Sequence, residues 1–169
     1  MTAAPAQSIV LELGLLAPRE AREHARRACA GVTSKRQAEE VRLVVSELVT
    51  NAVRHGKGQI RLVLRVRRGE VFVAVQDGGC AFAVPLLVAD PFREGGRGLP
   101  IVAELASDWA IASLGEAGNV VWCVVHAGAR RGAGAGVRPG VAFLLGGTER
   151  IDERGSCEPG PPFLNKTAV

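Results

Sequence analysis

The chain has 169 residues, with 21 Lys and Arg against 17 Asp and Glu, a formal net charge of +4, and 47% hydrophobic residues. This length is typical of one domain with a core of its own. The hydrophobic fraction excludes a chain that is disordered throughout, and no uncharged run reaches the roughly 18 residues that a membrane span needs. We therefore expect a soluble globular protein that does not bind a membrane.

The N-terminal apolar run, residues 9–16, contains Glu12 and has no basic segment before it. It does not resemble a signal peptide, so we expect a cytoplasmic protein. The four cysteines lack the C-x-x-C spacing of metal or redox sites and are interpreted as reduced, structural thiols. The basic residues are spread out without interleaved aromatic residues, so nucleic-acid binding is not indicated.

Glycine and proline divide the chain into two parts. Residues 1–126 hold 12 Gly and 5 Pro, whereas residues 127–169 hold 9 Gly and 4 Pro. A stretch this rich in Gly and Pro usually does not pack into a core. We predict one domain over residues 1–126 and a disordered tail over residues 127–169.

The first elements predicted are a strand and a helix. One side of a strand is indicated over residues 8–13, where Ile9, Leu11 and Leu13 alternate with Ser8, Val10 and Glu12. Pro18 suits the first position of a helix, and Gly31 suits its end. The apolar positions of this helix fall on one face: Ala21, Ala25, Ala28 and Cys29.

A second helix is the clearest prediction in the chain. Ser34 and Gln37 have the spacing of a capping box, and Gly56 follows the last apolar position. The apolar positions recur at helical intervals: Val41, Val44, Val45, Leu48, Val49 and Ala52.

Two hairpins and a short helix are predicted in the remainder of the domain. Residues 60–66 and 71–75 alternate about a turn at Arg68-Gly69, which indicates a hairpin with one dry face. Residues 99–106 have the pattern of a short helix, and residues 109–114 and 120–125 that of a second hairpin.

This order of elements predicts an α/β protein of the α+β two-layer type. Hairpins make neighbouring strands antiparallel, so the sheet should be mixed or antiparallel, with the helices on one face.

Glu47 and Asn51 are the first candidate functional residues. They lie four apart on the second helix, so both project from the same stripe. A carboxylate beside an amide oxygen suits a hydrated Mg²⁺ and the deprotonation of a hydroxyl group. Taken alone, the pair is more typical of a surface glutamate and an asparagine near a helix end.

Asp77-Gly78-Gly79 follows directly on a predicted strand. An aspartate at a strand end can accept a hydrogen bond from an exocyclic amine, and the glycines let the backbone approach a flat ring. An ordinary strand-ending turn uses the same residues.

Gly95-Gly96-Arg97-Gly98 precedes the short helix. The free N–H groups at a helix N-terminus favour a phosphate, and Arg97 adds further donors. The segment is not a Walker motif, and a G-x-G pair by itself is a weak signal.

The three motifs occur in a fixed order, and together they resemble the N box and the two glycine boxes of the GHKL ATPases. The matching segments are SELVTNAVRHG at 46–56, QDGG at 76–79 and GGRGLPIV at 95–102. The chain is most similar to the small bacterial anti-sigma-factor serine/threonine kinases. This resemblance implies a Bergerat-type ATP-binding fold.

The resemblance also implies a role for each motif residue. Asn51 would hold Mg²⁺, Asp77 the adenine amine, and Gly79 would let the ring approach. Glu47 would be the base that activates a serine or threonine hydroxyl, and residues 80–97 would form a lid. The phosphates would be surrounded by Gly96, Arg97 and Gly98.

The activity implied is that of an ATP-dependent serine/threonine protein kinase. It would bind a sigma factor and phosphorylate a STAS-type antagonist, and a homodimer is left open. The alternative is a non-catalytic ATP-binding module that sequesters a protein partner. A histidine-kinase catalytic domain is less favoured, because the sequence lacks a helical hairpin with a phosphoacceptor histidine.

Overall fold

The computed structural model of the chain describes residues 6–79, 98–114 and 117–128. The lid predicted at residues 80–97 and almost all of the predicted tail lie outside these ranges. The elements in chain order are β1 (Gln7–Leu11), α1 (Ala17–Cys29), α2 (Lys35–His55), β2 (Ile60–Arg67), β3 (Glu70–Asp77), α3 (Gly98–Leu105), β4 (Asp108–Ser113) and β5 (Asn119–His126).

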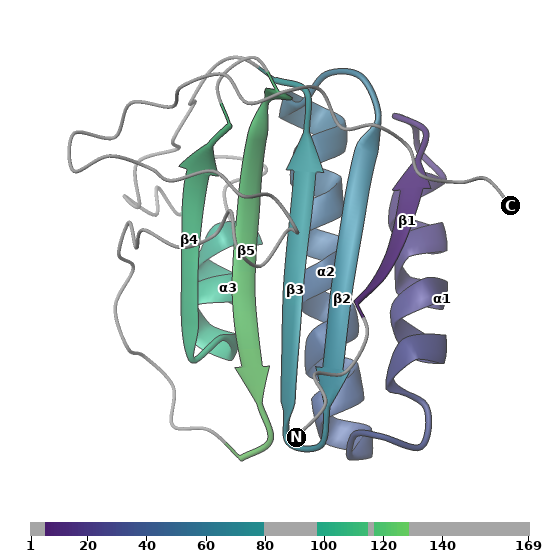
Figure 1. Cartoon of the computed structure of the whole chain (residues 1–169), viewed down its shortest axis with the longest axis vertical. Coiled ribbons are helices and arrows are strands. Elements are labelled where there is room, and N and C mark those ends of the chain that lie inside the picture. Colours follow the sequence, from purple (N-terminus) through teal and green to yellow (C-terminus); the bar gives the residue numbers. More distant parts are fainter. Residues whose placement is uncertain (1–5, 80–97, 115–116, 129–169) are drawn as a thin grey trace, which may run out of the picture. The chain divides into compact units, whose positions relative to one another are not determined.

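The described strands form one sheet in the order β1-β2-β3-β5-β4 (Figure 1). Every neighbouring pair is antiparallel, so of the two predicted arrangements the antiparallel one is confirmed. Both predicted hairpins form, as β2–β3 and β4–β5. The β3–β5 pairing joins the two hairpins and places strands that are far apart in sequence side by side.

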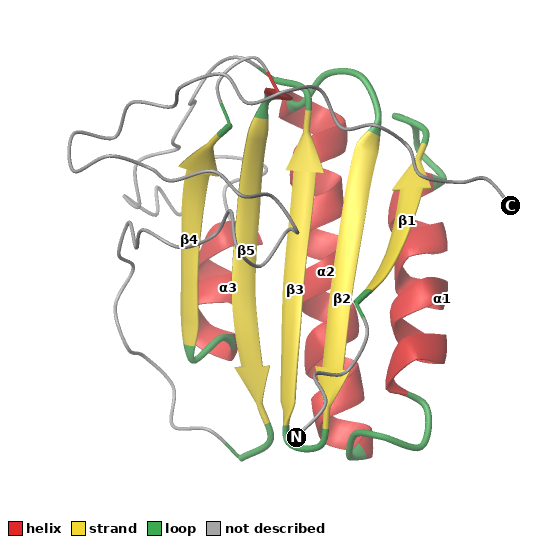
Figure 2. Cartoon of the chain, in the orientation of Figure 1, coloured by secondary structure: helices red, strands yellow, loops and turns green. Residues whose placement is uncertain are grey.

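The helices cover one face of the sheet, as predicted (Figure 2). α1 packs on β1 and β2, α2 on β2, β3 and β5, and α3 on β4. The layer between them is the hydrophobic core, filled by the alternating residues of the strands and the apolar stripes of the helices. This two-layer α+β sandwich agrees with the fold class that the sequence predicts.

The first strand is shorter than its alternation indicates. β1 ends at Leu11, which pairs with Ile60, the first residue of β2. Because the partner strand begins there, the ladder cannot extend further. Leu13 lies beyond it with 42% of its surface exposed, so its assignment to the strand was wrong.

Helix α1 has the predicted buried face, and Pro18 lies in its first turn, where no backbone N–H is needed. The helix ends at Cys29, two residues before Gly31, whose φ is +73°.

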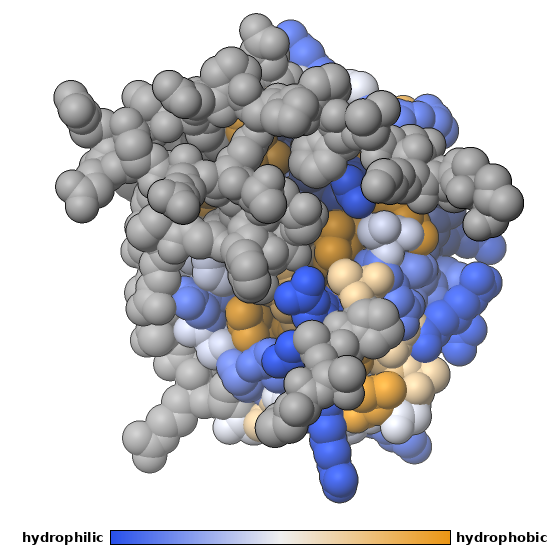
Figure 3. Space-filling model, in the orientation of Figure 1, coloured by the Kyte–Doolittle hydropathy of each residue, from blue (hydrophilic) through white to orange (hydrophobic). Residues whose placement is uncertain are grey.

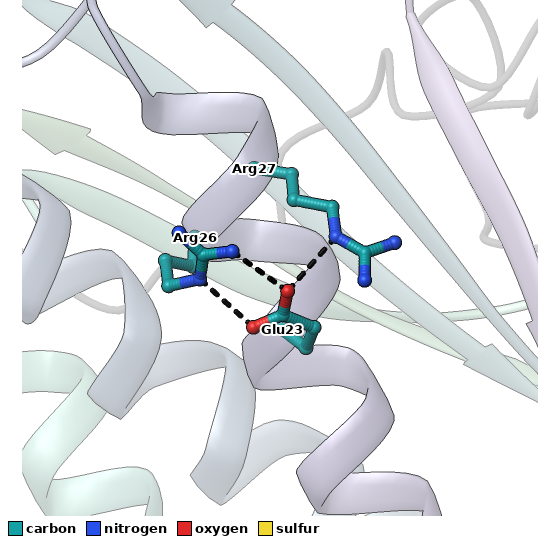
Figure 4. Close-up of polar contacts among 3 residues, drawn as sticks. All are labelled: Glu23, Arg26 and Arg27. Atoms are coloured by element: carbon teal, nitrogen blue, oxygen red, sulfur yellow. Dashed lines mark hydrogen bonds and ion pairs between the residues drawn. The ribbon is translucent and has the colours of Figure 1, made fainter.

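On the outer side of α1, Glu23 accepts hydrogen bonds from Arg26 and Arg27 (Figure 4). The bond from Arg26 is the main reason that the pKa of Glu23 falls to about 2. Exposed pairs of this kind contribute little stability, so we assign this cluster no functional role.

Helix α2 is longer, with 21 residues, and all of the predicted apolar positions are buried. Ser34 caps it by accepting a hydrogen bond from the backbone N–H of Gln37 at 3.2 Å. The second half of the predicted capping box is absent. The buried side chain of Gln37 instead donates to the carbonyl oxygen of Val125 at 3.0 Å and so joins the start of α2 to β5.

The face of the sheet away from the helices is not uniformly polar, so the expectation of a single dry face was wrong. Four apolar residues form a row in register across β2, β3, β5 and β4 and are buried: Val63, Ala74, Trp122 and Ala110. The ring of Phe72 stacks on that of Trp122 with 6.0 Å between centroids. Figure 3 looks onto this face and shows both hydrophobic and hydrophilic surface.

Two of the four cysteines, Cys29 and Cys123, lie in the described ranges, and both are buried and free. Burial raises the pKa of each thiol, most strongly for Cys123, which agrees with structural, unreactive thiols. Cys80 and Cys157 lie outside the described residues. None of the helices described is long and apolar enough to cross a membrane.

The cap of α2 provides a test of the fold. We expect Ser34→Ala to lower the free energy of unfolding by about 1 kcal/mol, because the Gln37 N–H then loses its partner. Chemical denaturation measures this change, with Ser8→Ala on the exposed side of β1 as the control. An unchanged midpoint for Ser34→Ala would contradict the cap.

Candidate functional site

Two of the candidate residues, Asp77 and Gly79, lie where α2 ends, β3 ends and β5 begins, at the top of Figure 1. The three ends meet there because β3 runs antiparallel to both β2 and β5, while α2 runs alongside it on the helical face. Asp77, the last residue of β3, therefore lies opposite Asn119, the first residue of β5. The last turn of α2 lies beneath them.

The carboxylate of Asp77 is half-buried, and one of its oxygens is held by the turn that follows it. Oδ1 accepts a hydrogen bond from the backbone N–H of Gly79 at 2.8 Å. Oδ2 makes no hydrogen bond or ion pair with the described part of the chain. This oxygen is therefore available to accept a hydrogen bond from a ligand.

Two glycines, Gly56 and Gly118, allow the neighbouring segments to pack closely against Asp77. A Cβ on Gly56, the C-cap of α2, would come within 2.8 Å of Cβ and Cγ of Asp77. A Cβ on Gly118 would overlap the carbonyl oxygen of Asp77, and the φ of Gly118, +98°, also favours glycine. The end of α2 and the turn before β5 can approach Asp77 this closely only because neither has a side chain there.

The Asp77-Gly78-Gly79 turn is tied to both neighbouring segments. The backbone N–H of Gly78 donates to the carbonyl oxygen of Lys57 at 2.8 Å. Nδ2 of Asn119 donates to the carbonyl oxygen of Gly79 at 2.7 Å. Gly79 itself is buried, and a Cβ there would come within 2.7 Å of Oδ1 of Asp77. The backbone position of Gly79 is thus fixed at both its N–H and its carbonyl group.

On α2, Asn51 lies about one and a half turns and Glu47 about two and a half turns before Gly56. Both are half-buried, and neither side chain makes a hydrogen bond or ion pair with any residue that the structure describes. The start of α3 lies against Glu47, since a Cβ on Gly98 would be 3.1 Å from its Oε2. At 1.5 Å per helical residue, Glu47 and Gly56 are roughly 13 Å apart along α2.

The structure brings the predicted residues together in two groups along α2. Asp77 and Gly79 lie at its C-terminal end, and Glu47 lies beside Gly98 nearer its middle, with Asn51 between the groups. Gly96 and Arg97 lie outside the described residues, so their predicted role at the phosphates is not tested. Within the described ranges, no three His, Cys, Asp or Glu side chains are placed to hold a metal ion.

Sequence reasoning missed three contributions to this site. Gly56 was predicted as a helix end and as the last residue of the 46–56 motif, but with no contact to Asp77, and Gly118 and Asn119 were predicted only as part of a hairpin loop. A Gly-Asn pair before a strand is so common in turns that it gives no functional signal by itself. Only the β3–β5 pairing places these residues against Asp77.

A comparison with known families decides what this arrangement is. The model of the histidine kinase-like ATPase domain family matches residues 15–125, which is more than half of the chain and includes every predicted site residue. The chain belongs to this family. No curated protein matches it.

A histidine kinase-like ATPase domain implies ATP, typically with Mg²⁺, and the residues present fit that ligand. Oδ2 of Asp77 can accept a hydrogen bond from an amine, and the glycines around it leave a site that side chains would fill. The oxygens of Asn51 and Glu47 are the type that Mg²⁺ prefers, and Mg²⁺ usually takes its remaining ligands from water and phosphate. Binding of Mg²⁺ together with ATP therefore does not require a cluster of three acidic residues in the protein.

The hydrogen bond to Oδ1 of Asp77 gives a test of base recognition. In Asp77→Asn the amide oxygen should keep the bond from Gly79, which turns the NH₂ group toward the ligand. We expect ATP to bind about 10- to 100-fold more weakly, because a donor then faces the adenine amine. Inosine triphosphate, which has a carbonyl in place of that amine, should lose less affinity.

Calorimetric titration of both nucleotides into the Asp77→Asn variant and the unmodified chain measures this change. Equal affinity of the unmodified chain for ATP and GTP would contradict the role given to Asp77.

Proposed function

We propose that the chain is an ATP-dependent serine/threonine protein kinase of the anti-sigma-factor type, which phosphorylates a STAS-type antagonist. The observation that carries the proposal is the position of Glu47. Its carboxylate lies against Gly98 at the start of α3 and makes no hydrogen bond or ion pair within the described residues. A structural glutamate at a helix–helix contact would be expected to have a partner, because burying an unpaired charge is unfavourable.

In this proposal the Asp77 end of the site binds the base. Oδ2 accepts a hydrogen bond from the exocyclic amine of adenine, and the glycines at positions 56, 79 and 118 let the backbone approach the ring. Selectivity for adenine follows, since guanine carries a carbonyl where adenine carries this amine.

The other end of the site binds the phosphates. Asn51 holds Mg²⁺, which would neutralise charge on the phosphate oxygens. The start of α3 lies in the same region, since a Cβ on Gly98 would be 3.1 Å from Oε2 of Glu47, and the free N–H groups of a helix start favour a phosphate. Gly96 and Arg97 precede that helix start in the sequence and complete the proposed phosphate site.

Glu47 acts as the general base. It accepts the proton of a serine or threonine hydroxyl on the protein substrate, whose oxygen then bonds to the γ-phosphorus. The bond from this phosphorus to the oxygen of ADP breaks, and ADP leaves. The carboxylate of Glu47 suits this role, because it lies beside the start of α3, close to the proposed phosphate site, and is paired to no cation among the described residues.

The partners follow from the resemblance of the three motifs. A sigma factor would be bound by the kinase and released when the unmodified antagonist replaces it. Phosphorylation adds nearly two negative charges to the antagonist, which weakens its docking and reverses the exchange. The alternative function, a non-catalytic module that sequesters its partner, needs ATP binding without a base.

The test is transfer of radiolabelled phosphate from ATP to antagonist proteins encoded nearby. We expect Glu47→Gln to lower the transfer rate by a factor of about 100 or more, because general bases contribute on that scale, while ATP affinity changes little. Glu39→Gln is the matched control, since Glu39 is an exposed carboxylate on the same helix, paired with Arg42 and away from Gly98.

Two results would count against the proposal. Transfer at the unmodified rate by Glu47→Gln would show that Glu47 is not the base. ATP binding without any transfer by the unmodified chain would favour the sequestering module.

A further inference from the structure

Asn119 is a residue of the site that the proposed function leaves without a role. It opens β5, lies opposite Asp77 in the sheet, and is half-buried. Its side-chain Nδ2 donates to the carbonyl oxygen of Gly79 at 2.7 Å, which is short for a bond between two uncharged groups. The bond joins β5 to the turn that carries Asp77.

Gly79 needs such a bond because a glycine has more backbone freedom than any other residue. Its N–H donates to Oδ1 of Asp77, and its carbonyl accepts from Asn119. Among the described residues, no other group bonds to either of these positions. Loss of the Asn119 bond would free the Gly79 backbone to rotate, and its N–H would no longer hold Oδ1 in place.

The orientation of the Asp77 carboxylate depends on this chain of two hydrogen bonds. While Oδ1 is held by Gly79, Oδ2 points away from the turn and can accept from a ligand. A carboxylate without that bond could rotate about χ2, and a ligand would have to restrict it again on binding. Preorganisation of this kind strengthens binding without any direct contact to the ligand.

We propose that Asn119 is a positioning residue for recognition of the adenine amine, acting through Gly79 on the carboxylate of Asp77. The inference rests on the proposed adenine nucleotide site. It gives the turn before β5 a part in base selectivity. This part is indirect, because the side-chain amide of Asn119 donates to the Gly79 carbonyl rather than to the ligand. Gly118, next to it, allows the turn to come this close.

The experiment compares two ligands, ATP and purine riboside triphosphate, which lacks the exocyclic amine. Their dissociation constants are measured by calorimetry on the unmodified full-length chain and on Asn119→Ala. We expect ATP affinity to fall about 5- to 20-fold in Asn119→Ala, the effect of losing one hydrogen bond in a preorganised site. The affinity for purine riboside triphosphate should change less than twofold, since it makes no bond to Asp77.

Two further variants separate positioning from folding. Asn119→Asp keeps the size of the side chain but places an acceptor against the Gly79 carbonyl, so it should lose the preference for ATP as Asn119→Ala does. Gln76→Ala removes a different bond to the same turn, the one from Nε2 to the carbonyl of Ala117 at 3.1 Å, and should keep the preference. Thermal unfolding of each variant shows that the comparison is made on folded protein.

The outcomes distinguish this inference from the proposed function. If the unmodified chain binds ATP in preference to purine riboside triphosphate and Asn119→Ala keeps that preference, Asn119 has no positioning role and the site assignment stands. Equal losses for both ligands would show a structural role only and would also overturn the inference. If the unmodified chain binds neither ligand, the adenine site and the inference both fail.

Discussion

The antiparallel pairing of β3 with β5 determines where the candidate site lies. The register runs from Glu70 opposite His126 to Asp77 opposite Asn119. A shift by one residue would turn the alternating side chains of one strand to the other face, so the core valines of β3 or β5 would leave the layer under the helices. The burial of the core therefore fixes the register, and the register sets the last pair, Asp77 and Asn119, against the end of α2.

Helix α2 connects the two ends of the site. Its apolar stripe packs on three strands, and Ser34 and Gln37 attach its first turn, so the helix lies in a fixed position on the sheet. Glu47, Asn51 and Gly56 then follow at separations set by the helical rise. The proposed site for the base at one end and the proposed site for the phosphates at the other would therefore be held apart by one rigid element. If a flexible loop joined the two ends instead of a helix, the distance between Glu47 and Gly56 would vary.

Local patterns predicted most of the fold. The period of the apolar residues in α2 predicted its buried face, Ser34 and Gly56 predicted its ends, and the two hairpins followed from alternation about turns. The β3–β5 pairing could not be predicted in this way, because it depends on contacts between residues more than 40 positions apart. The role of Gln37 also escaped prediction, since its spacing from Ser34 fits a cap equally well and only the position of β5 decides where the side chain goes.

The sequence predicted the residues of the candidate site that carry functional groups. It did not predict that two glycines contribute by lacking a side chain. Glu47, Asn51 and Asp77 are recognisable by type and spacing, and the structure places all three along α2 and the adjoining end of β3. Gly56 and Gly118 contribute by having no side chain, and a glycine in a turn gives no sign of what it lies against. Asn119 was missed because its partner, the Gly79 carbonyl, belongs to the backbone and has no sequence signature.

The most direct test of the central claim is a crystal structure of the chain with Mg²⁺ and a non-hydrolysable ATP analogue. We expect the adenine amine within hydrogen-bond distance of Oδ2 of Asp77, the Gly79 bond to Oδ1 retained, and Mg²⁺ on the side-chain oxygen of Asn51. A nucleotide bound with its base away from Asp77, or at another place on the sheet, would contradict it.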